Sequence, residues 1–123
     1  MTLPPINYQK RGRDDRLRSA KHLAFIRKRL CVAWHLQICQ GRVEAAHLRD
    51  LAPMGHGGAR PDDLFTVGMC GRHHRESEKR EAASQQELGL DLMALAIEYG
   101  MQSPDPAIKA AAKAFLALAK AAE

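Results

Sequence analysis

The amino-acid sequence predicts a small α+β domain in which two short strands lie between helices at both ends. Three observations lead to this fold class. Apolar residues recur at three- and four-residue steps over about 15–29. Two short apolar segments flank a Gly- and Pro-rich stretch at 49–63, and residues 106–122 are rich in Ala, Lys and Leu. These are the patterns of an amphipathic helix, a loose hairpin and a second helix.

The first helix is expected to begin after Asp14 or Asp15, either of which can serve as its N-cap. Its apolar face would comprise Leu17, Ala20, Leu23, Ile26 and Leu30, and most of the basic residues would lie on the opposite face.

The strands are expected in RVEAAHL (42–48), which alternates, and in LFTVGM (64–69). The connection between them, RDLAPMGHGGARPDD, must be a loop because it is rich in Gly and Pro. Loops of this length inside a small domain usually have a function.

Three helices are expected after the hairpin. One starts near Arg72, a second covers about 86–99 with Gly100 as its C-cap, and the last covers 106–122. Asp105 and Pro106 are suited to the N-cap and first turn of that last helix. Its narrow apolar stripe must dock on the domain or on a second copy of the chain; the stripe consists of Ile108, Ala112, Phe115 and Ala119.

The chain is long enough for one compact domain with short appendages. We expect a basic, mobile arm over 1–14, a domain over 15–100 and a C-terminal Ala-rich helical segment over 101–123. Large aromatic side chains are few, so the core is thin and a metal ion would help to stabilise it.

The charge distribution predicts a polyanionic partner. The formal net charge is +5, and nine of the nineteen Lys and Arg residues fall within residues 10–29. Such a concentration of positive charge suits the phosphate backbone of a nucleic acid, whereas the alternative is a solvated helix face. The sequence has no apolar segment long enough to cross a membrane and no signal peptide, so a cytoplasmic location is expected. Three cysteines in that compartment favour metal ligation over disulfides.

Four residues can form a zinc site. Cys70 and His73 have the spacing of two ligands that bind one ion, and Cys31 with Cys39 can complete a Cys3His set. Such a site could contribute on the order of 10 kcal/mol of folding free energy. The seven residues between Cys31 and Cys39 exceed the usual spacing, and the alternative is that both are small buried apolar groups.

Three further residues can form a catalytic set. His74 and Glu78 are four residues apart on the expected helix and can hold a divalent cation from one face. His47, at the end of the first strand, can then take a proton from water. The alternatives are a surface His–Glu hydrogen bond and a structural strand histidine.

Three segments together resemble a family of phage and prophage HNH endonucleases. They are HLAFIRKRLC (22–31), VEAAHLR (43–49) and ARPDDLFTVGMCGRHHRE (59–76). This family is related to the phage recombination-enhancement nucleases that depend on a host recombinase, and the resemblance covers about residues 20–100. It implies a zinc-stapled ββα-metal core (the His-Me finger), with His47 as general base and His74 as a ligand of the catalytic metal.

The sequence departs from the family pattern at several positions. Glu78 replaces a histidine, which favours Mg²⁺ or Mn²⁺ over softer cations. Ala46 and Phe65 occupy positions where the family has polar residues, so Asp62 or Asp63 is expected to orient His47, and Asp63 is assigned to the catalytic set. Trp34 stands at the expected place of a knuckle cysteine, and Cys39 fits only after an insertion of about five residues.

The resulting expectation is a metal-dependent endonuclease of bacterial phage or prophage origin that hydrolyses nucleic acid, DNA above all, with low sequence specificity. Its phosphate contacts would come from Arg49, Arg72, Arg75 and the N-terminal residues Arg11, Arg13, Arg16 and Arg18. One alternative is a zinc module that binds nucleic acid or a phage or host partner without cleaving it. Another is an interaction protein that forms a homodimer through its C-terminal helix. Dependence on a host recombinase is implied by the resemblance alone.

Overall fold

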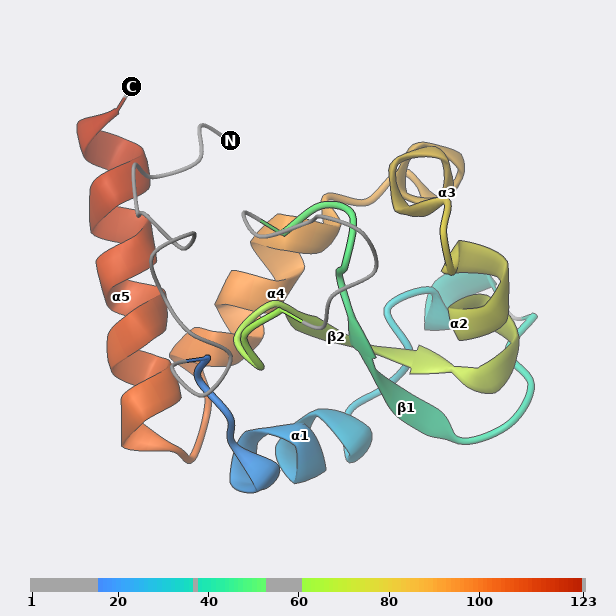
Figure 1. Ribbon diagram of the computed structural model, residues 1–123. Helices are drawn as coiled ribbons and strands as arrows, with labels where there is room; N and C mark the ends of the chain where they lie inside the picture. The colour runs from blue at the N-terminus through green and yellow to red at the C-terminus, as the bar shows by residue number, and fades with distance from the viewer. Residues whose placement is uncertain (1–15, 37, 53–60, 123) are drawn as a thin grey trace.

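The computed structural model describes residues 16–36, 38–52 and 61–122 (Figure 1). The expected N-terminal arm and the expected cap at Asp14 or Asp15 lie outside these residues. Within them the chain is a small α+β structure whose elements are α1 (Ala20–Arg27), the short 3-10 helix η3 (Trp34–Leu36), β1 (Val43–His47), β2 (Thr66–Cys70), α2 (Gly71–Ser77), α3 (Glu81–Leu88), α4 (Leu92–Met101) and α5 (Pro106–Ala121).

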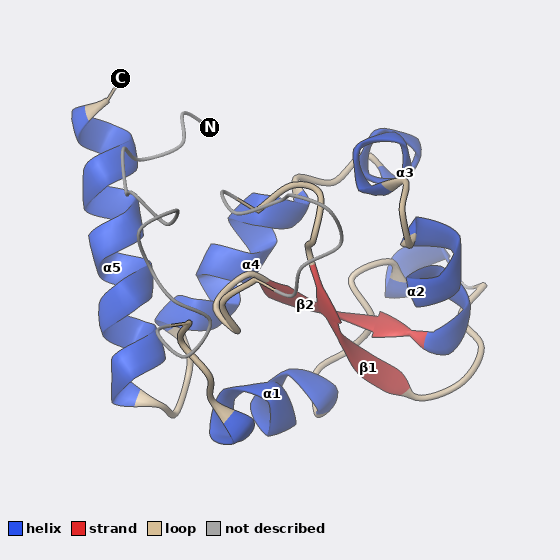
Figure 2. Ribbon diagram, viewed as in Figure 1, coloured by secondary structure: helices blue, strands red, loops and turns tan. Residues whose placement is uncertain are grey.

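The two strands form an antiparallel pair followed at once by a helix (Figure 2). Val43 pairs with Cys70 at one end and His47 pairs with Thr66 at the other. Helices α1 and α4 pack against the pair, and α2 continues from the end of β2. This register places the start of β1 beside the start of α2. A hairpin followed by a helix is the order that the sequence predicted.

The first helix is shorter than expected. It begins after Ser19, whose hydroxyl accepts a hydrogen bond from the backbone N–H of His22, and it ends at Arg27. Leu17 precedes the helix, where its N–H donates to Asp62 Oδ1 at 3.0 Å. Leu30 lies beyond the helix and is 66% exposed, so its assignment to the apolar face was wrong.

The segment after the hairpin is two helices where one was expected near Arg72. Helix α2 ends at Ser77, Lys79 adopts a left-handed backbone with φ of 63°, and α3 begins at Glu81. Gly89, with φ of 68°, closes α3 in the left-handed conformation that favours glycine.

Gly100 is not the C-cap that the sequence suggested. It lies inside α4, which ends at Met101, and it is buried where α4 crosses α5. A Cβ atom at this position would lie 2.5 Å from Leu64 Cδ1 and 3.0 Å from Ala112 Cβ. Glycine is therefore present because the two helices approach closely.

We expect Gly100→Ala to lower the free energy of unfolding by about 1–2 kcal/mol. Overpacking costs about 1–3 kcal/mol, and the better helix propensity of alanine returns up to about 1 kcal/mol. Urea denaturation followed by circular dichroism measures the change. Leu64→Ala removes the nearest clashing atom but also costs core packing, so the effect is measured as a double-mutant cycle: Gly100→Ala should cost less in the Leu64→Ala background than in wild type. If Gly100→Ala alone is as stable as wild type, Gly100 is not required by the close approach of α4 and α5.

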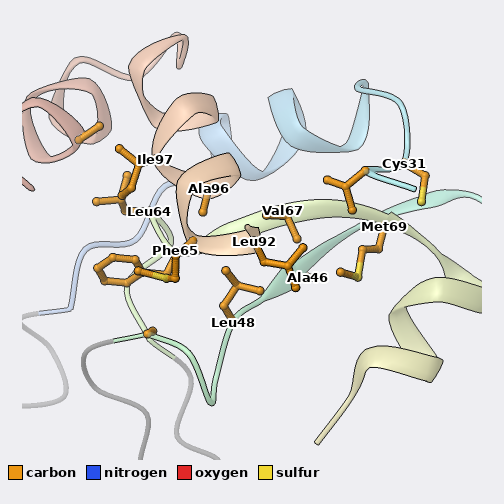
Figure 3. Close-up of a cluster of buried hydrophobic side chains, with 14 of the residues drawn as sticks. Cys31, Ala46, Leu48, Leu64, Phe65, Val67, Met69, Leu92, Ala96 and Ile97 are labelled. Atoms are coloured by element: carbon orange, nitrogen blue, oxygen red, sulfur yellow. The ribbon is translucent and has the colours of Figure 1, made fainter. Parts of the chain in front are cut away.

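Helix α5 docks within its own chain. Its predicted stripe of Ile108, Ala112, Phe115 and Ala119 is buried, and the Phe115 ring meets the Phe65 ring edge-on at 5.7 Å between centroids. The stripe that suggested a homodimer is thus already covered by the core. That core runs from Phe65 and Leu64 beneath α4 and α5 to Met69 and Cys31 near the other end of the strands (Figure 3).

A buried histidine links α1 to the connection before α5. His22 is fully buried, and its Nδ1 lies 2.8 Å from Ser103 Oγ. Burial lowers the pKa of His22, although the charges of Asp63 and Asp105 act in the opposite direction. Burial in the folded protein therefore favours the neutral form of this imidazole.

Stability should consequently fall as the pH drops below about 6.5, the ordinary pKa of histidine in an unfolded chain. In that range His22 binds a proton in the unfolded state but not in the folded state. The free energy of unfolding therefore falls by at most about 1.4 kcal/mol per pH unit. Urea unfolding at several pH values measures the slope. We expect His22→Gln to have a shallower slope than wild type; equal slopes would contradict a neutral buried His22.

Candidate functional site

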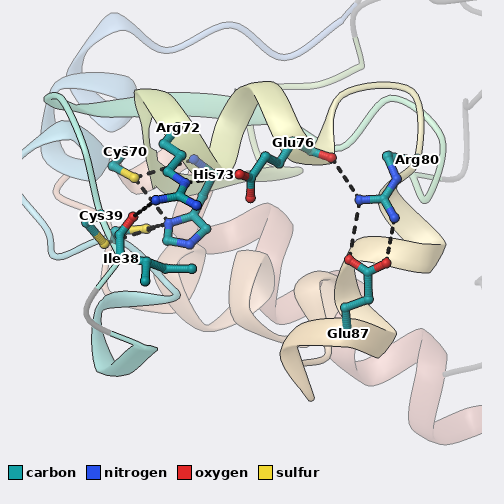
Figure 4. A network of polar contacts seen from close by, with 9 residues as sticks. Ile38, Cys39, Cys70, Arg72, His73, Glu76, Arg80 and Glu87 are labelled. Carbon is teal, nitrogen blue, oxygen red and sulfur yellow. Dashed lines mark hydrogen bonds and ion pairs between the residues drawn. The ribbon is translucent and has the colours of Figure 1, made fainter.

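Four metal-ligating side chains meet at one point of the fold. The ligand atoms of Cys31, Cys39, Cys70 and His73 all lie within 4.8 Å of one another. His73 Nδ1 lies 3.1 Å from the sulfur of Cys70, 3.4 Å from that of Cys31 and 3.7 Å from that of Cys39. Figure 4 shows the sulfur atoms of Cys39 and Cys70 gathered around the His73 ring. These are the four residues that the sequence predicted.

Local backbone structure explains how ligands from three segments converge. Cys70 is the N-cap of α2, which turns His73 back toward it. The N–H of Val32 donates to the carbonyl of Gly68 at 2.9 Å and so ties the Cys31 segment to β2. The 3-10 helix η3 takes up part of the wide spacing between Cys31 and Cys39. Trp34, at the expected place of a knuckle cysteine, is instead 58% exposed.

The donor set fits a tetrahedral zinc ion. With Zn–S and Zn–N bonds of about 2.3 and 2.0 Å, a tetrahedral site separates a sulfur from a nitrogen ligand by roughly 3.5 Å. The three separations around His73 bracket that value. Three thiolates and one imidazole are also a set that zinc prefers. Cys31, Cys39, Cys70 and His73 could therefore hold one structural metal ion such as zinc.

The electrostatics of the cluster favour a cation. Burial disfavours the Cys70 thiolate, but hydrogen bonds from His73 and Gln40 outweigh it and lower the pKa of Cys70 to about 6. Desolvation and the neighbouring sulfurs of Cys31 and Cys70 raise the pKa of Cys39 to about 12. Without a cation, the thiols therefore cannot all ionise together, whereas a bound divalent ion would remove the conflict.

The second predicted site begins with His47 and Asp63. His47 Nε2 lies 2.8 Å from Asp63 Oδ1, and the Asp63 side chain is 1% exposed. The other carboxylate oxygen accepts the N–H of Ser19 at 2.7 Å, and Arg18 forms an ion pair with Oδ1 at 3.2 Å. Asp63 is thus fixed by the start of α1. Of the two aspartates considered, it is the one that contacts His47, whereas Asp62 accepts from Leu17.

His47 and His74 line the same cavity, about 220 Å³ in volume, together with Glu78. His74 lies in α2, and its Nδ1 lies 2.7 Å from Glu44 Oε1 on β1. Glu78 is the C-cap of α2, and its backbone N–H donates to the carbonyl of His74 at 3.1 Å, one helical turn away. The chain leaves the helix only after Glu78, whose φ of −59° is still helical, and the side chains of His74 and Glu78 border the same cavity.

Two carboxylates of this region carried no predicted role. Glu44 contacts His74, and its only sequence signal was a charged residue within an apolar strand. Glu81 is 6% exposed and accepts the backbone N–H groups of Arg49, Asp50 and Leu51 at 2.9–3.1 Å. Burial raises the pKa of Glu81 despite these hydrogen bonds. Glu81 fixes the chain just after His47, a role that only the tertiary structure reveals.

The predicted phosphate contacts lie in different surroundings. Arg49 lines the cavity of His47, and Arg75 is exposed on α2. Arg72 is engaged by Glu76 at 3.0 Å and by the carbonyl of Ile38 at 3.3 Å (Figure 4). Arg18 donates hydrogen bonds to Asp63 and to the carbonyl of Pro61, so it helps to hold the carboxylate that contacts His47. Arg16 is half-buried, whereas Arg11 and Arg13 lie outside the described residues.

Comparison with known proteins assigns the chain to a family. Residues 2–102 match the family described as "Protein of unknown function (DUF968)", and because the match covers most of the chain, the chain belongs to that family. No curated protein matches it, and no solved structure does. In the part of the chain that the structure describes, no helix has the length and apolar character needed to cross a membrane.

Proposed function

We propose that this member of the DUF968 family is a metal-dependent HNH-type endonuclease that hydrolyses phosphodiester bonds in nucleic acid, DNA above all. The observation that carries the proposal is the shared cavity of His47, His74 and Glu78 beside a separate Cys/His cluster. The order of strand, strand and helix, with His47 on β1 and His74 on α2, supports the proposal because it is the order expected of a ββα-metal unit.

The contact with Asp63 prepares His47 to act as a base. If Asp63 accepts a hydrogen bond from the Nε2–H of His47, the lone pair of the ring lies on Nδ1. His47 would then remove a proton from water as the water oxygen bonds to phosphorus. The bond from phosphorus to one ester oxygen breaks, and that oxygen takes a proton from solvent, which yields a phosphate monoester and a hydroxyl group. Asp63 would stabilise the imidazolium that forms.

His74 and Glu78 are the residues that would hold the catalytic cation. The contact of His74 Nδ1 with Glu44 orients the ring and leaves Nε2 for a metal, as second-sphere carboxylates do at other histidine ligands. The carboxylate of Glu78 suits Mg²⁺ or Mn²⁺. A divalent cation at this position would neutralise charge on the scissile phosphate. Arg49 and Lys79, which line the same cavity, would hold flanking phosphates.

One observation favours a second candidate function, a module that binds nucleic acid through its basic residues without cleaving it. Ala46 is 3% exposed and Phe65 is fully buried, so the two positions where the resemblance expects polar side chains belong to the apolar core. The Cys/His cluster would preserve such a module without any catalytic metal. Binding to a host recombinase, expected from the resemblance alone, would suit either function.

A plasmid-nicking assay on the zinc-loaded chain tests the proposal. We expect conversion of supercoiled to relaxed DNA with Mg²⁺ or Mn²⁺ and none after these ions are omitted. The His74→Ala variant should lose this activity while keeping its zinc. If wild type binds DNA with a steep salt dependence but does not cleave it with Mg²⁺, Mn²⁺ or Ni²⁺, the non-catalytic function is correct.

A further inference from the structure

We propose that a groove between the end of α1 and helix α4 binds unpaired nucleotides by stacking a base on Trp34. The groove measures about 450 Å³ and is bordered by Lys28, Arg29, Leu30, Trp34, His35 and Tyr99, among others. It is distinct from the cavity of His47 and shares no lining residue with it.

Exposed apolar side chains mark this surface. Trp34 is 58% exposed and Leu30 is 66% exposed, and the neighbouring Leu36 and Ile38 are 39% and 43% exposed. These four are the exposed large hydrophobic residues of the described chain, and all of them lie within nine consecutive positions. Scattered exposed apolar residues need no explanation, but a group of them at one place indicates an interaction surface.

The charge of the groove selects the kind of partner. Lys28 and Arg29 are exposed at its edge, and no described residue that lines it is acidic. The Arg29 guanidinium lies 4.0 Å from the centroid of the Phe25 ring, which holds it beside the groove. An aromatic side chain in the same groove as two cations matches a nucleic-acid strand, whose phosphates can contact the cations while its bases stack on the ring.

Stacking on Trp34 requires a base whose face is free. The bases of a duplex are stacked on one another, so their faces cannot reach an indole at the surface, whereas the bases of a single strand can. The geometry therefore favours single-stranded segments, at gaps, branches or melted ends. Apolar protein partners fit the hydrophobic residues equally well but leave the cations of the groove unexplained.

The position of the groove relates it to the proposed reaction. Cys31 lines the groove and belongs to the Cys/His cluster, while His73 of the same cluster precedes His74 of the catalytic cavity. The cluster thus lies next to both sites in the chain. The groove would also select the substrate of the proposed nuclease, and this part of the inference rests on that proposed function. The preferred substrate would carry an unpaired segment next to the bond that is cut.

The experiment measures binding without catalysis. Trp34 is the single tryptophan of the chain, so a base that stacks on it should quench the intrinsic tryptophan fluorescence of the protein. Zinc-loaded wild-type protein is titrated, in the absence of Mg²⁺ and Mn²⁺, with an oligothymidylate of roughly 12 nucleotides, a length within the known range of single-strand sites. Fluorescence anisotropy of a labelled oligonucleotide gives the affinity of variants that lack the indole. A duplex of the same length serves as the comparison.

We expect quenching by the single strand, and a loss of single-strand affinity of about five- to 100-fold in Trp34→Ala. Trp34→Phe should keep most of the affinity. Gln86→Ala, which removes an exposed uncharged side chain on α3 outside the groove, should keep all of it. Arg29→Gln should weaken binding and reduce its salt dependence. Equal zinc content shows that each variant has folded.

Several results would overturn the inference. One is an unchanged affinity of Trp34→Ala for the single strand. Another is a loss of affinity in Trp34→Ala that is the same for the duplex and the single strand. A tryptophan signal that responds to protein concentration but not to the oligonucleotide would assign the groove to protein contacts instead. If single-strand binding depends on Trp34 but the chain cleaves no DNA, only the nuclease function is refuted. If the chain cleaves DNA but neither binding nor cleavage changes in Trp34→Ala, only this inference is refuted.

Discussion

Removal of zinc from the Cys31, Cys39, Cys70 and His73 cluster is expected to unfold most of the chain. The cluster joins the segment after α1, the segment before β1, and the junction of β2 with α2. A structural zinc site contributes on the order of 10 kcal/mol, which is comparable with the whole stability of a small domain. Loss of the ion should therefore abolish the cooperative thermal transition.

Metal analysis should find one zinc per chain, and a strong chelator should remove it together with the helical circular dichroism signal. Cys70→Ser should behave like the chelated protein, because a serine hydroxyl can still cap α2 but does not replace the thiolate as a zinc ligand. The Glu87→Gln variant is a suitable control, since Glu87 is exposed and pairs with Arg80 on the surface (Figure 4). A metal-free chain that melts at the temperature of the loaded chain would refute the structural role of the cluster.

Replacement of His47 is expected to reduce phosphodiester cleavage by about 10²- to 10⁴-fold, the usual contribution of a general base. Its contact with the buried Asp63 is the physical reason, because that carboxylate fixes the orientation of the ring. Initial rates of plasmid nicking with Mg²⁺ or Mn²⁺ measure the effect.

Two variants separate proton transfer from packing. His47→Ala removes the ring, whereas His47→Gln leaves an amide that can donate to Asp63 but cannot accept a proton at neutral pH. Similar rate losses in both, at unchanged zinc content, are expected. If His47→Gln cleaves as fast as wild type, His47 is not the base.

Cleavage should also depend on Asp63, although its removal affects the fold. Asp63 accepts the N–H of Ser19 and binds Arg18, so its replacement disturbs the start of α1 as well as His47. This double connection explains why the candidate base and the first helix are coupled. It also makes the His47 variants the cleaner test of the chemistry.

Several features were determined by the sequence alone. Periodicity and turn residues placed the two strands and α5 close to their observed bounds, because a short strand pair and an Ala-rich helix are dictated by local preferences. Ligand chemistry identified the four residues of the Cys/His cluster, since few other residue types bind a transition metal. The coarse α+β class followed from the same patterns.

The tertiary structure decided what depends on contacts between distant segments. It replaced the expected cap at Gly100 by a close helix crossing, because the room available for a Cβ is set by Leu64 and Ala112. It brought Glu44 to His74 and Glu81 to the chain after His47. Neither of these two pairings has a spacing that local preferences encode. Both arise because residues 30 or more positions apart pack together.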